Sequence, residues 1–501
     1  MTDILDTDIA VIGTGTAGLT AFHEVRRAGR SALLIDHGPL GTTCARTGCM
    51  PSNAVLHAAH QWAVLRELLG AQPTNSSTSA DDLWQQALSM RDALANGAAK
   101  HTRETAGDQL LMGIARFVSA GELDVDGRRV RAKAVVVATG SRPIIPAFLK
   151  ALGNSVLTTD TLFARKRLPR SIGIVGAGAV GLEMAVALSR LGVRVVAADL
   201  KSAPGGIVDP VIAERAIRRF REEFTLWLGR PVQVDPGPSG AEVRSGDEAE
   251  LVEVVLASLG REPNLDALDL AATGATAQSN GQFSADRATL RLPGTSVFLA
   301  GDVHPDRPLM HEAADEGVIT ARGAVALVEG RPILPATRRT SLGIVFSDPN
   351  ICSVGMPFDE TDPKSTVVGT AEGSSNGRSR ILHAESSLLR IYARRDDGLL
   401  LGASLLAVHG EHLAHQHAWA VQRGETVQSL LDLPYYHPTV EEMMQSALKD
   451  AARQMHSFHI LIPVVTDPLG PFRFFCTHRY WRPLARAPMP RICSSNRTFT
   501  G

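Results

Sequence analysis

The stretch Gly13-Thr14-Gly15-Thr16-Ala17-Gly18 follows the apolar run of residues 8–12 and opens a helical pattern that extends to about residue 27. A second apolar run, residues 31–35, ends at Asp36. Strand, glycine-rich turn, helix, strand and acid, in this order, are typical of a βαβ unit that binds a dinucleotide. The first glycine permits the turn, the second admits a pyrophosphate to the backbone, and the third lets the helix pack on the strand. Asp36 is then placed to accept a hydrogen bond from a ribose hydroxyl.

The same pattern recurs at Gly176-Ala177-Gly178-Ala179-Val180-Gly181, between apolar runs at 172–175 and 193–198. Asp199 lies 18 residues after Gly181, as Asp36 does after Gly18. A lone glycine motif is weak support, but two in the right context predict two dinucleotide sites, each with its phosphates at a helix N-terminus. A carboxylate at Asp199 repels a 2′-phosphate, which favours NADH over NADPH, although Lys201 lies two residues on.

A pair of cysteines, Cys44 and Cys49, lies between these two motifs. In a regular helix their spacing gives about 7.5 Å of rise, which is too long for a disulfide. A bridge therefore requires an irregular loop, which Gly48 permits. Pro51 is tolerated in a first helical turn, so we expect Cys49 at a helix N-terminus, where its thiolate is favoured. The alternative without chemistry is that both are buried free cysteines. No metal site is expected, because no other Cys or His lies nearby at ligand spacing.

The bulk composition is that of an ordinary globular enzyme. The 501 residues predict about three domains, and the net charge of −1 gives no reason to expect a nucleic-acid or membrane partner. No apolar run reaches the length of a membrane span. With five cysteines and no signal-peptide profile at the N-terminus, we expect a reducing compartment, the cytoplasm, where a close cysteine pair more often means redox chemistry than a structural bridge.

Together these segments resemble the pyridine nucleotide–disulfide oxidoreductases, most closely the dihydrolipoyl dehydrogenases, over roughly residues 5–453. The resemblance includes the following segments: 41–52, 138–143, 260–264, 300–302, 345–349 and 437–439. It implies an α/β fold with two Rossmann-like domains, for FAD and NAD, and a C-terminal α+β dimerisation domain. The expected boundaries are 1–149 for the FAD domain with the cysteine pair, 150–264 for the NAD domain, 265–336 for a part completing the FAD domain, 337–453 for the dimerisation domain and 454–501 for a poorly ordered tail.

The resemblance also implies residue roles. Cys49 faces the flavin and forms a thiolate against it, Cys44 exchanges with the substrate, His437 is the acid–base, and Glu442 orients it. In this family the last two serve the opposite subunit, so a homodimer is implied. The implied FAD residues are Gly13, Gly15, Gly18, Asp36, Gly41, Thr43, Asn53, Thr139, Gly140, Asp302 (on the ribityl chain), and Met310, His311 and Ala313 in a helix aimed at the pyrimidine end. The implied NAD residues are Gly176, Gly178, Gly181, Glu183, Asp199 and Gly260.

One position departs from the family pattern. Where the family has a lysine paired with the glutamate that matches Glu183, this chain has Asn53. A positive charge near a flavin stabilises its reduced anion, so its loss predicts a lower flavin reduction potential and slower hydride transfer.

The predicted reaction is oxidation of a dihydrolipoyl group by NAD⁺, giving a lipoyl group and NADH. The substrate is a small dithiol or disulfide, or a lipoyl domain. Three alternatives stay open: an NAD(P)H-dependent reductase of another disulfide or of mercuric ion, an FAD-bearing scaffold with little turnover, and a diaphorase or transhydrogenase that does not use the cysteines. Four histidines, at 409, 412, 415 and 417, are expected on a helix surface.

Overall fold

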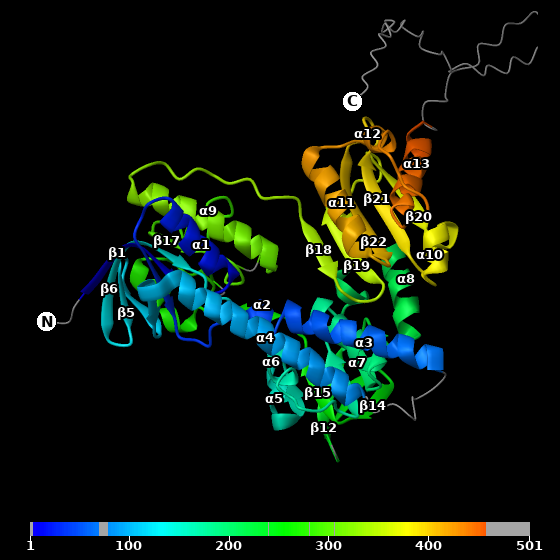
Figure 1. The fold of residues 1–501 in the computed structure, drawn as a ribbon, viewed down its shortest axis with the longest axis horizontal. Coiled ribbons are helices and arrows are strands. Elements are labelled where there is room, and N and C mark those ends of the chain that lie inside the picture. The colour runs from blue at the N-terminus through cyan, green and yellow to red at the C-terminus, as the bar shows by residue number, and fades with distance from the viewer. Residues whose placement is uncertain (1–3, 70–78, 239, 280, 305, 457–501) are drawn as a thin grey trace, which may run out of the picture. The chain divides into compact units, whose positions relative to one another are not determined.

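The computed structural model describes residues 4–69, 79–238, 240–279, 281–304 and 306–456. Three main sheets follow one another along the chain, the first two mostly parallel and the third antiparallel (Figure 1). Residues 457–501, which hold nearly all of the predicted tail, lie outside the described residues. Within the described ranges, no helix is both long and apolar enough to cross a membrane.

The first sheet has the order β3-β2-β1-β6-β5-β4, with β17 paired to β6. Its central strands are buried on both faces, as expected for a parallel sheet. Helices α1 (Thr16–Arg27) and α9 (Met310–Val328) cover one face, and a segment that includes Leu268, Leu270, Ala285 and Leu292 packs on the other. The strands are β1 (Ile4–Ile12), β2 (Ala32–Asp36), β3 (Leu110–Met112), β4 (Ala115–Ser119), β5 (Glu122–Val125), β6 (Arg128–Val137) and β17 (Val297–Leu299).

The second sheet has the order β11-β10-β9-β15-β8. One face packs on helices α3, α7 and α8, and the other packs on a three-stranded antiparallel ribbon, β12-β13-β14. The sequence predicts one strand over residues 251–256, but the chain leaves the ribbon at Glu253 and enters the parallel sheet, so two strands form. The strands are β8 (Val156–Leu157), β9 (Ser171–Val175), β10 (Arg194–Asp199), β11 (Thr225–Leu228), β12 (Val232–Gly237), β13 (Gly240–Ser245), β14 (Glu248–Val252) and β15 (Val254–Ala257).

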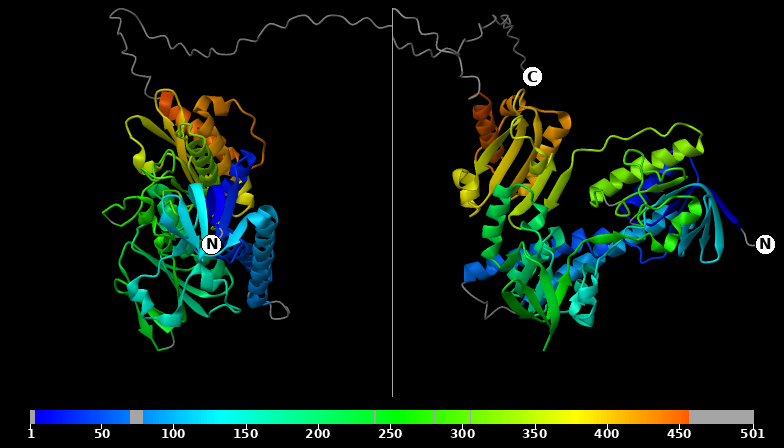
Figure 2. Two further views of the ribbon diagram at one scale, coloured as in Figure 1. Left: turned by 90° about the vertical axis from the view of Figure 1, so that its left-hand side faces the viewer. Right: turned by 180° about the vertical axis from the view of Figure 1, so that it is seen from behind.

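Helices and a short ribbon join the first two sheets. Strand β7 (Ser141–Pro143) leaves the first sheet and pairs antiparallel with β16 (Arg261–Pro263), which returns to it. Helices α3 and α4 pack against each other (Figures 1 and 2). The remaining helices of this part are α2 (Thr43–Arg46), α3 (Cys49–Leu69), α4 (Ala80–Ala106), α5 (Ala147–Lys150), α6 (Thr159–Leu162), α7 (Ala179–Arg190) and α8 (Pro210–Arg221).

The third sheet is antiparallel, in the order β18-β19-β22-β21-β20. Helices α11, α12 and α13 pack against it. His417 lies on the inner face of α11 and is 1% exposed, so the prediction of a surface position was wrong for it; His409, His412 and His415 are exposed. The elements are β18 (Leu342–Val345), β19 (Asn350–Gly355), β20 (Thr366–Glu372), β21 (Leu388–Arg394), β22 (Leu400–Ala407), α10 (Gly377–Ile381), α11 (Gly410–Arg423), α12 (Val427–Leu431) and α13 (Glu442–His456).

Candidate active site

The first glycine-rich turn connects β1 to α1. Gly13 has φ +107°, and a Cβ on it would lie 2.2 Å from the carbonyl oxygen of Ala138. A Cβ on Gly18 would lie 1.9 Å from the carbonyl oxygen of Gly13, because helix and strand are in close contact there. A Cβ on Gly15 would meet nothing within 4 Å. The first and third glycines are therefore required by the fold, and the second leaves the open space that a pyrophosphate needs.

The second turn, between β9 and α7, repeats this geometry. A Cβ on Gly176 would lie 2.2 Å from the carbonyl oxygen of Ser258, one on Gly181 would lie 1.9 Å from that of Gly176, and one on Gly178 would meet nothing within 4 Å. Asp199 ends β10 and accepts hydrogen bonds from the backbone of Ala177 (2.7 Å) and Lys201 (2.9 Å). The turn thus fits a second dinucleotide.

At the end of β2, Asp36 is held in a similar way. One of its carboxylate oxygens accepts from both the backbone N–H and the hydroxyl of Thr14, each at 2.7 Å, and the other accepts from Gly38 N–H at 2.6 Å. The carboxylate is fixed beside the glycine-rich turn, where the sequence places a ribose.

The two cysteines meet because the helical path is broken between them. Helix α2 ends at Arg46 and α3 begins at Cys49. A Cβ on Gly48 would lie 3.1 Å from Cys44 Cα, so this turn is close to a steric limit. Both thiols are free, and they form a hydrogen bond with each other. The irregular loop and the helix start at Cys49 are as predicted.

In the reduced pair each cysteine shifts the pKa of the other. The pKa of Cys44 is lowered to about 7, first because the Cys49 thiol hydrogen-bonds to it, while burial opposes the shift and the backbone N–H groups of Cys49 and Met50 support it. The pKa of Cys49 is raised by the hydrogen bond with Cys44, by burial and by the negative charges of Cys44 and Glu183. The N-terminus of α3 stabilises the sulfur that lies over it, which in the reduced pair belongs to the preceding cysteine.

Glu183, in the first turns of α7, is 8% exposed. It accepts a hydrogen bond from the Phe346 backbone N–H at 2.9 Å, while the Ser52 hydroxyl donates to the Cys49 carbonyl oxygen at 3.0 Å. Burial raises the pKa of Glu183, although the Phe346 N–H and the nearby Ser52 hydroxyl act against the shift. Within the described part of the chain no basic side chain forms an ion pair with it, and Asn53 instead donates to the Cys49 carbonyl oxygen at 2.9 Å.

Residues distant in sequence complete the surroundings of the first turn. Asp302 follows β17 and accepts a hydrogen bond from Ser141 Oγ at 2.9 Å, and its charge acts on Cys44. Gly140, with φ +69°, and Thr139 bond to the returning strand through Asn264. The other predicted FAD and NAD residues lie in turns and at the starts of helices. Gly41 has φ +115°, Thr43 begins α2, Gly260 precedes β16, and Met310, His311 and Ala313 lie in the first turn of α9.

His437 and Glu442 lie beside the third sheet. His437 Nδ1 is 3.0 Å and 3.1 Å from the two Glu442 carboxylate oxygens, and its side chain is 76% exposed. Burial opposes the shift, but the hydrogen bonds with His437 and the Thr439 backbone lower the pKa of Glu442. Glu442 therefore orients the imidazole ring of His437, and the other ring nitrogen, Nε2, faces away from Glu442.

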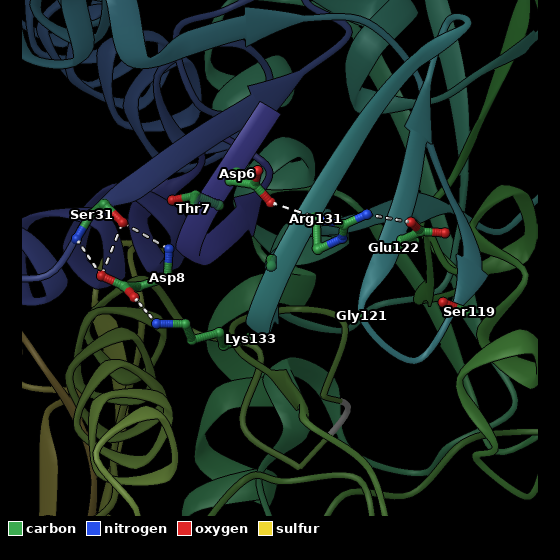
Figure 3. A pocket seen from close by; sticks show the side chains of 10 residues that line it. Asp6, Thr7, Asp8, Ser31, Ser119, Gly121, Glu122, Arg131 and Lys133 are labelled. Atoms are coloured by element: carbon green, nitrogen blue, oxygen red, sulfur yellow. Dashed lines mark hydrogen bonds and ion pairs between the residues drawn. The ribbon is translucent and has the colours of Figure 1, made fainter. Parts of the chain in front are cut away.

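A pocket of about 570 Å³ lies elsewhere on the first sheet, at the beginning of β1 and β6 (Figure 3). Its charges are paired, with Lys133 2.7 Å from Asp8 and Arg131 3.7 Å from Asp6. Ligands of open α/β sheets bind at the carboxyl ends of the strands, so this pocket is at the wrong end of the sheet for a cofactor. A cluster of metal-ligand types, His409, Glu411 and His412, lies at the exposed start of α11 and not beside the cysteines.

Comparison with known proteins now identifies the family. Residues 7–317 match the pyridine nucleotide-disulphide oxidoreductases, and residues 342–448 match the dimerisation domain of the same family. The chain belongs to the pyridine nucleotide-disulphide oxidoreductase family. It is an FAD- and NAD-dependent oxidoreductase that acts on sulfur groups, and the predicted fold class and cofactors are confirmed.

Relatives cover nearly the whole fold. The dihydrolipoyl dehydrogenase of Halobacterium salinarum is 29% identical, over 91% of this chain and 98% of its own length. That of Pseudomonas aeruginosa is 27% identical, over 92% and 100%. Among solved structures, the HOCl-induced flavoprotein disulfide reductase RclA from Escherichia coli superposes with a TM-score of 0.77 at 21% identity, covering 90% of this chain and 99% of its own. LpdA from Mycobacterium tuberculosis gives 0.76 at 24%, covering 88% and 99%.

Proposed function

We propose that this family member oxidises a dihydrolipoyl group with NAD⁺, through the pair Cys44 and Cys49. The observation that carries the proposal is the hydrogen-bonded pair of thiols at the start of α3, set between two dinucleotide turns. Relatives that match almost the full chain are named dihydrolipoyl dehydrogenases, which supports this choice of dithiol.

We assign the cofactor contacts as the sequence predicted them. Gly15 admits the FAD pyrophosphate, Asp36 binds its ribose and Asp302 its ribityl chain, while Gly178 and Asp199 do the same for NAD. The open space at Gly15 and Gly178, and the carboxylates fixed beside both turns, support these roles. When bound, FAD supplies a two-electron acceptor that passes a hydride to NAD⁺. The other FAD residues assigned are Gly13, Gly18, Gly41, Thr43, Asn53, Thr139, Gly140, Met310, His311 and Ala313, and the other NAD residues are Gly176, Gly181, Glu183 and Gly260.

The chain's own residues carry out the sulfur chemistry. A substrate thiolate attacks Cys44 of the Cys44–Cys49 disulfide, so a mixed disulfide forms and Cys49 leaves with the electron pair. The second substrate thiol then attacks the substrate sulfur bound to Cys44, and the cyclic disulfide is released as Cys44 leaves with the electron pair. Cys44 takes up the first proton from His437, which then accepts the proton of the second thiol. A low pKa makes a thiol a better leaving group, so the lowered pKa of Cys44 favours this second step.

Proton transfer is assigned to His437. It accepts the proton of the attacking substrate thiol, and Glu442 holds its ring and stabilises the imidazolium. The side chain is largely exposed and comes from the part of the chain that matches a dimerisation domain. We propose that it completes the cysteine site of a second subunit in a homodimer.

We propose the domain boundaries at 1–149, 150–264, 265–336 and 337–453, with 454–501 as a tail of separate character. We also propose a cytoplasmic location, since a pair that cycles between thiol and disulfide works against a reducing pool. No nucleic-acid or membrane partner is proposed.

The proposal is tested by NAD⁺ reduction with dihydrolipoamide, compared between native enzyme and Cys44→Ser. We expect activity to fall by about a thousandfold or more, because attack and leaving both occur at this sulfur. Cys352→Ser is the matched control, since Cys352 is 2% exposed in the core of the third sheet. Activity that survives Cys44→Ser would overturn the dithiol mechanism. Dye reduction without dihydrolipoamide activity would instead support a diaphorase, and faster reduction of another disulfide by NAD(P)H would support a reductase.

A further inference from the structure

Two carboxylates are buried in the first turns of α9. Glu312 is 2% exposed and Glu316 is 0% exposed, and their spacing of four residues places them on one face of the helix. Arg338 Nη2 lies 3.0 Å from Glu312 and 2.7 Å from Glu316, so one guanidinium bridges both acids. Arg307 adds a contact of 3.1 Å to Glu312. Removing such a partner strongly destabilises the folded protein, because it leaves an uncompensated charge buried.

The second carboxylate oxygen of Glu316 reaches the turn after β17. It accepts a hydrogen bond from the Gly301 backbone N–H at 2.7 Å. Gly301 has φ +76°, and a Cβ on it would lie 3.0 Å from Ala17 Cβ, so the turn is confined between α1 and α9. Asp302 is the next residue. Glu316 thus fixes the backbone from which the proposed ribityl-binding carboxylate projects.

Arg338 itself belongs to the connection between α9 and β18, residues 329–341. This connection runs back along α9, because Arg331 N–H bonds to the Ala326 carbonyl oxygen near the helix end while Arg338 reaches the helix start (Figure 1). Arg307 also donates to the Arg339 carbonyl oxygen at 3.1 Å. A segment far from the glycine-rich turn in sequence is therefore clamped to the same helix start.

We propose that Arg338 and Glu316 are positioning residues for the FAD site. Arg338 neutralises and orients Glu316, and Glu316 fixes the Gly301–Asp302 turn. Arg338 and Arg307 together balance the two buried carboxylates at the N-terminus of α9. The affinity for FAD and the reduction potential of the bound flavin both depend on this pair. The inference rests on the proposed function only through the assignment of Asp302 and α9 to the flavin.

The test compares Arg338→Gln with native holoenzyme. We expect the FAD dissociation constant, measured by flavin fluorescence on titrating the apoenzyme, to rise by about tenfold or more, since breaking a buried charge pair leaves uncompensated carboxylates. The reduction potential of the bound flavin should become more negative, because Glu316 then lies beside the flavin end of α9 without Arg338, while Arg307 still pairs with Glu312. Potential separates positioning from general loss of stability, because a uniformly destabilised protein that still binds FAD keeps its potential.

The neighbouring Arg339→Gln is the matched control, because Arg339 is 77% exposed and pairs with Asp315 at the surface. Arg338→Lys should recover only part of the loss, since an ammonium is a more strongly hydrated charge on a shorter, flexible side chain and is less favoured in a buried ion pair. Glu316→Gln serves if Arg338→Gln does not fold, and it should weaken FAD binding in the same direction. The inference would be overturned if the FAD dissociation constant of Arg338→Gln stayed within about twofold of the Arg339→Gln value and its flavin potential did not change. The same criterion for the dissociation constant applies to Glu316→Gln if that variant is used in its place. No dithiol substrate enters this measurement, so failure of the proposed reaction and failure of the positioning role give different results.

Discussion

The two glycine-rich turns have almost the same steric contacts, but different helices pack against them. Gly13, Gly15 and Gly18 face the same steric contacts as Gly176, Gly178 and Gly181, to within a few tenths of an ångström. Helix α1 is covered by α9, whereas α7 is covered by α3, the helix that begins at Cys49. The turn itself fixes where a pyrophosphate can approach. The two turns differ in the helix that packs against each of them.

The largest test of this comparison is to fill the open glycine in each turn. Gly15→Val should abolish FAD binding, because a branched side chain occupies the space left for the pyrophosphate. Gly178→Val should keep the flavin and lose reaction with NADH. Absorbance of the purified protein near the flavin bands measures the first, and stopped-flow reduction measures the second.

Gly97→Ala in α4 is the control for these variants, since its Cβ would also meet nothing within 4 Å but it lies in no turn. If Gly178→Val lost the flavin and Gly15→Val kept it, the assignment of the two turns would be reversed.

A smaller effect is expected from the acids that follow the turns. Asp199→Arg should lower the preference for NADH over NADPH by about a hundredfold. The substitution replaces a carboxylate that repels the 2′-phosphate of NADPH with a guanidinium that attracts it, and a facing like charge costs on the order of several kcal/mol. The ratio of kcat/KM values for the two nucleotides measures it. Lys201→Gln is the control and should alter the ratio far less, because Lys201 is exposed and forms no ion pair within the described residues. An unchanged ratio in Asp199→Arg would remove Asp199 from the ribose site.

The missing cation beside α7 gives a third prediction. Asn53→Lys should speed flavin reduction by NADH, since a positive charge close to a flavin stabilises its reduced anion and each ~1.4 kcal/mol of such stabilisation is about tenfold in rate. Glu183, buried without a basic partner among the described residues, is the acid that such a lysine would meet. Stopped-flow reduction that is unchanged or slower in Asn53→Lys would show that this position does not limit the reaction.

The smallest effect concerns the pH at which Cys44 reacts. Its folded pKa lies near 7, below the usual thiol value, so its thiolate is present above that pH and is lost as the pH falls through about 7. Alkylation of the reduced enzyme by iodoacetamide should follow this titration. Cys49→Ala should move the midpoint upward, because the hydrogen bond from the Cys49 thiol is the largest cause of the shift. A native midpoint above about 8.5 would contradict the assignment.

Much of the site was predictable because it is local. The glycine spacing, the acids Asp36 and Asp199, and the loop that breaks between Cys44 and Cys49 each depend on a few neighbouring residues whose backbone needs can be read directly. The helix start at Cys49 was also predicted correctly. The assignment of the flavin-facing thiolate to Cys49 stays a prediction, because it depends on how α2 folds back over the start of α3 and on the bound flavin.

The sequence by itself determined two dinucleotide turns, a reactive cysteine pair and the family to which they belong. The tertiary structure decided which groups share a charge environment. Arg338 meets Glu316 only because the connection runs back along α9, and buried Glu183 accepts a hydrogen bond from the backbone of Phe346, 163 residues further along the chain. Such long-range electrostatic contacts leave no local pattern in the sequence, since their energy depends on burial and distance rather than on spacing along the chain.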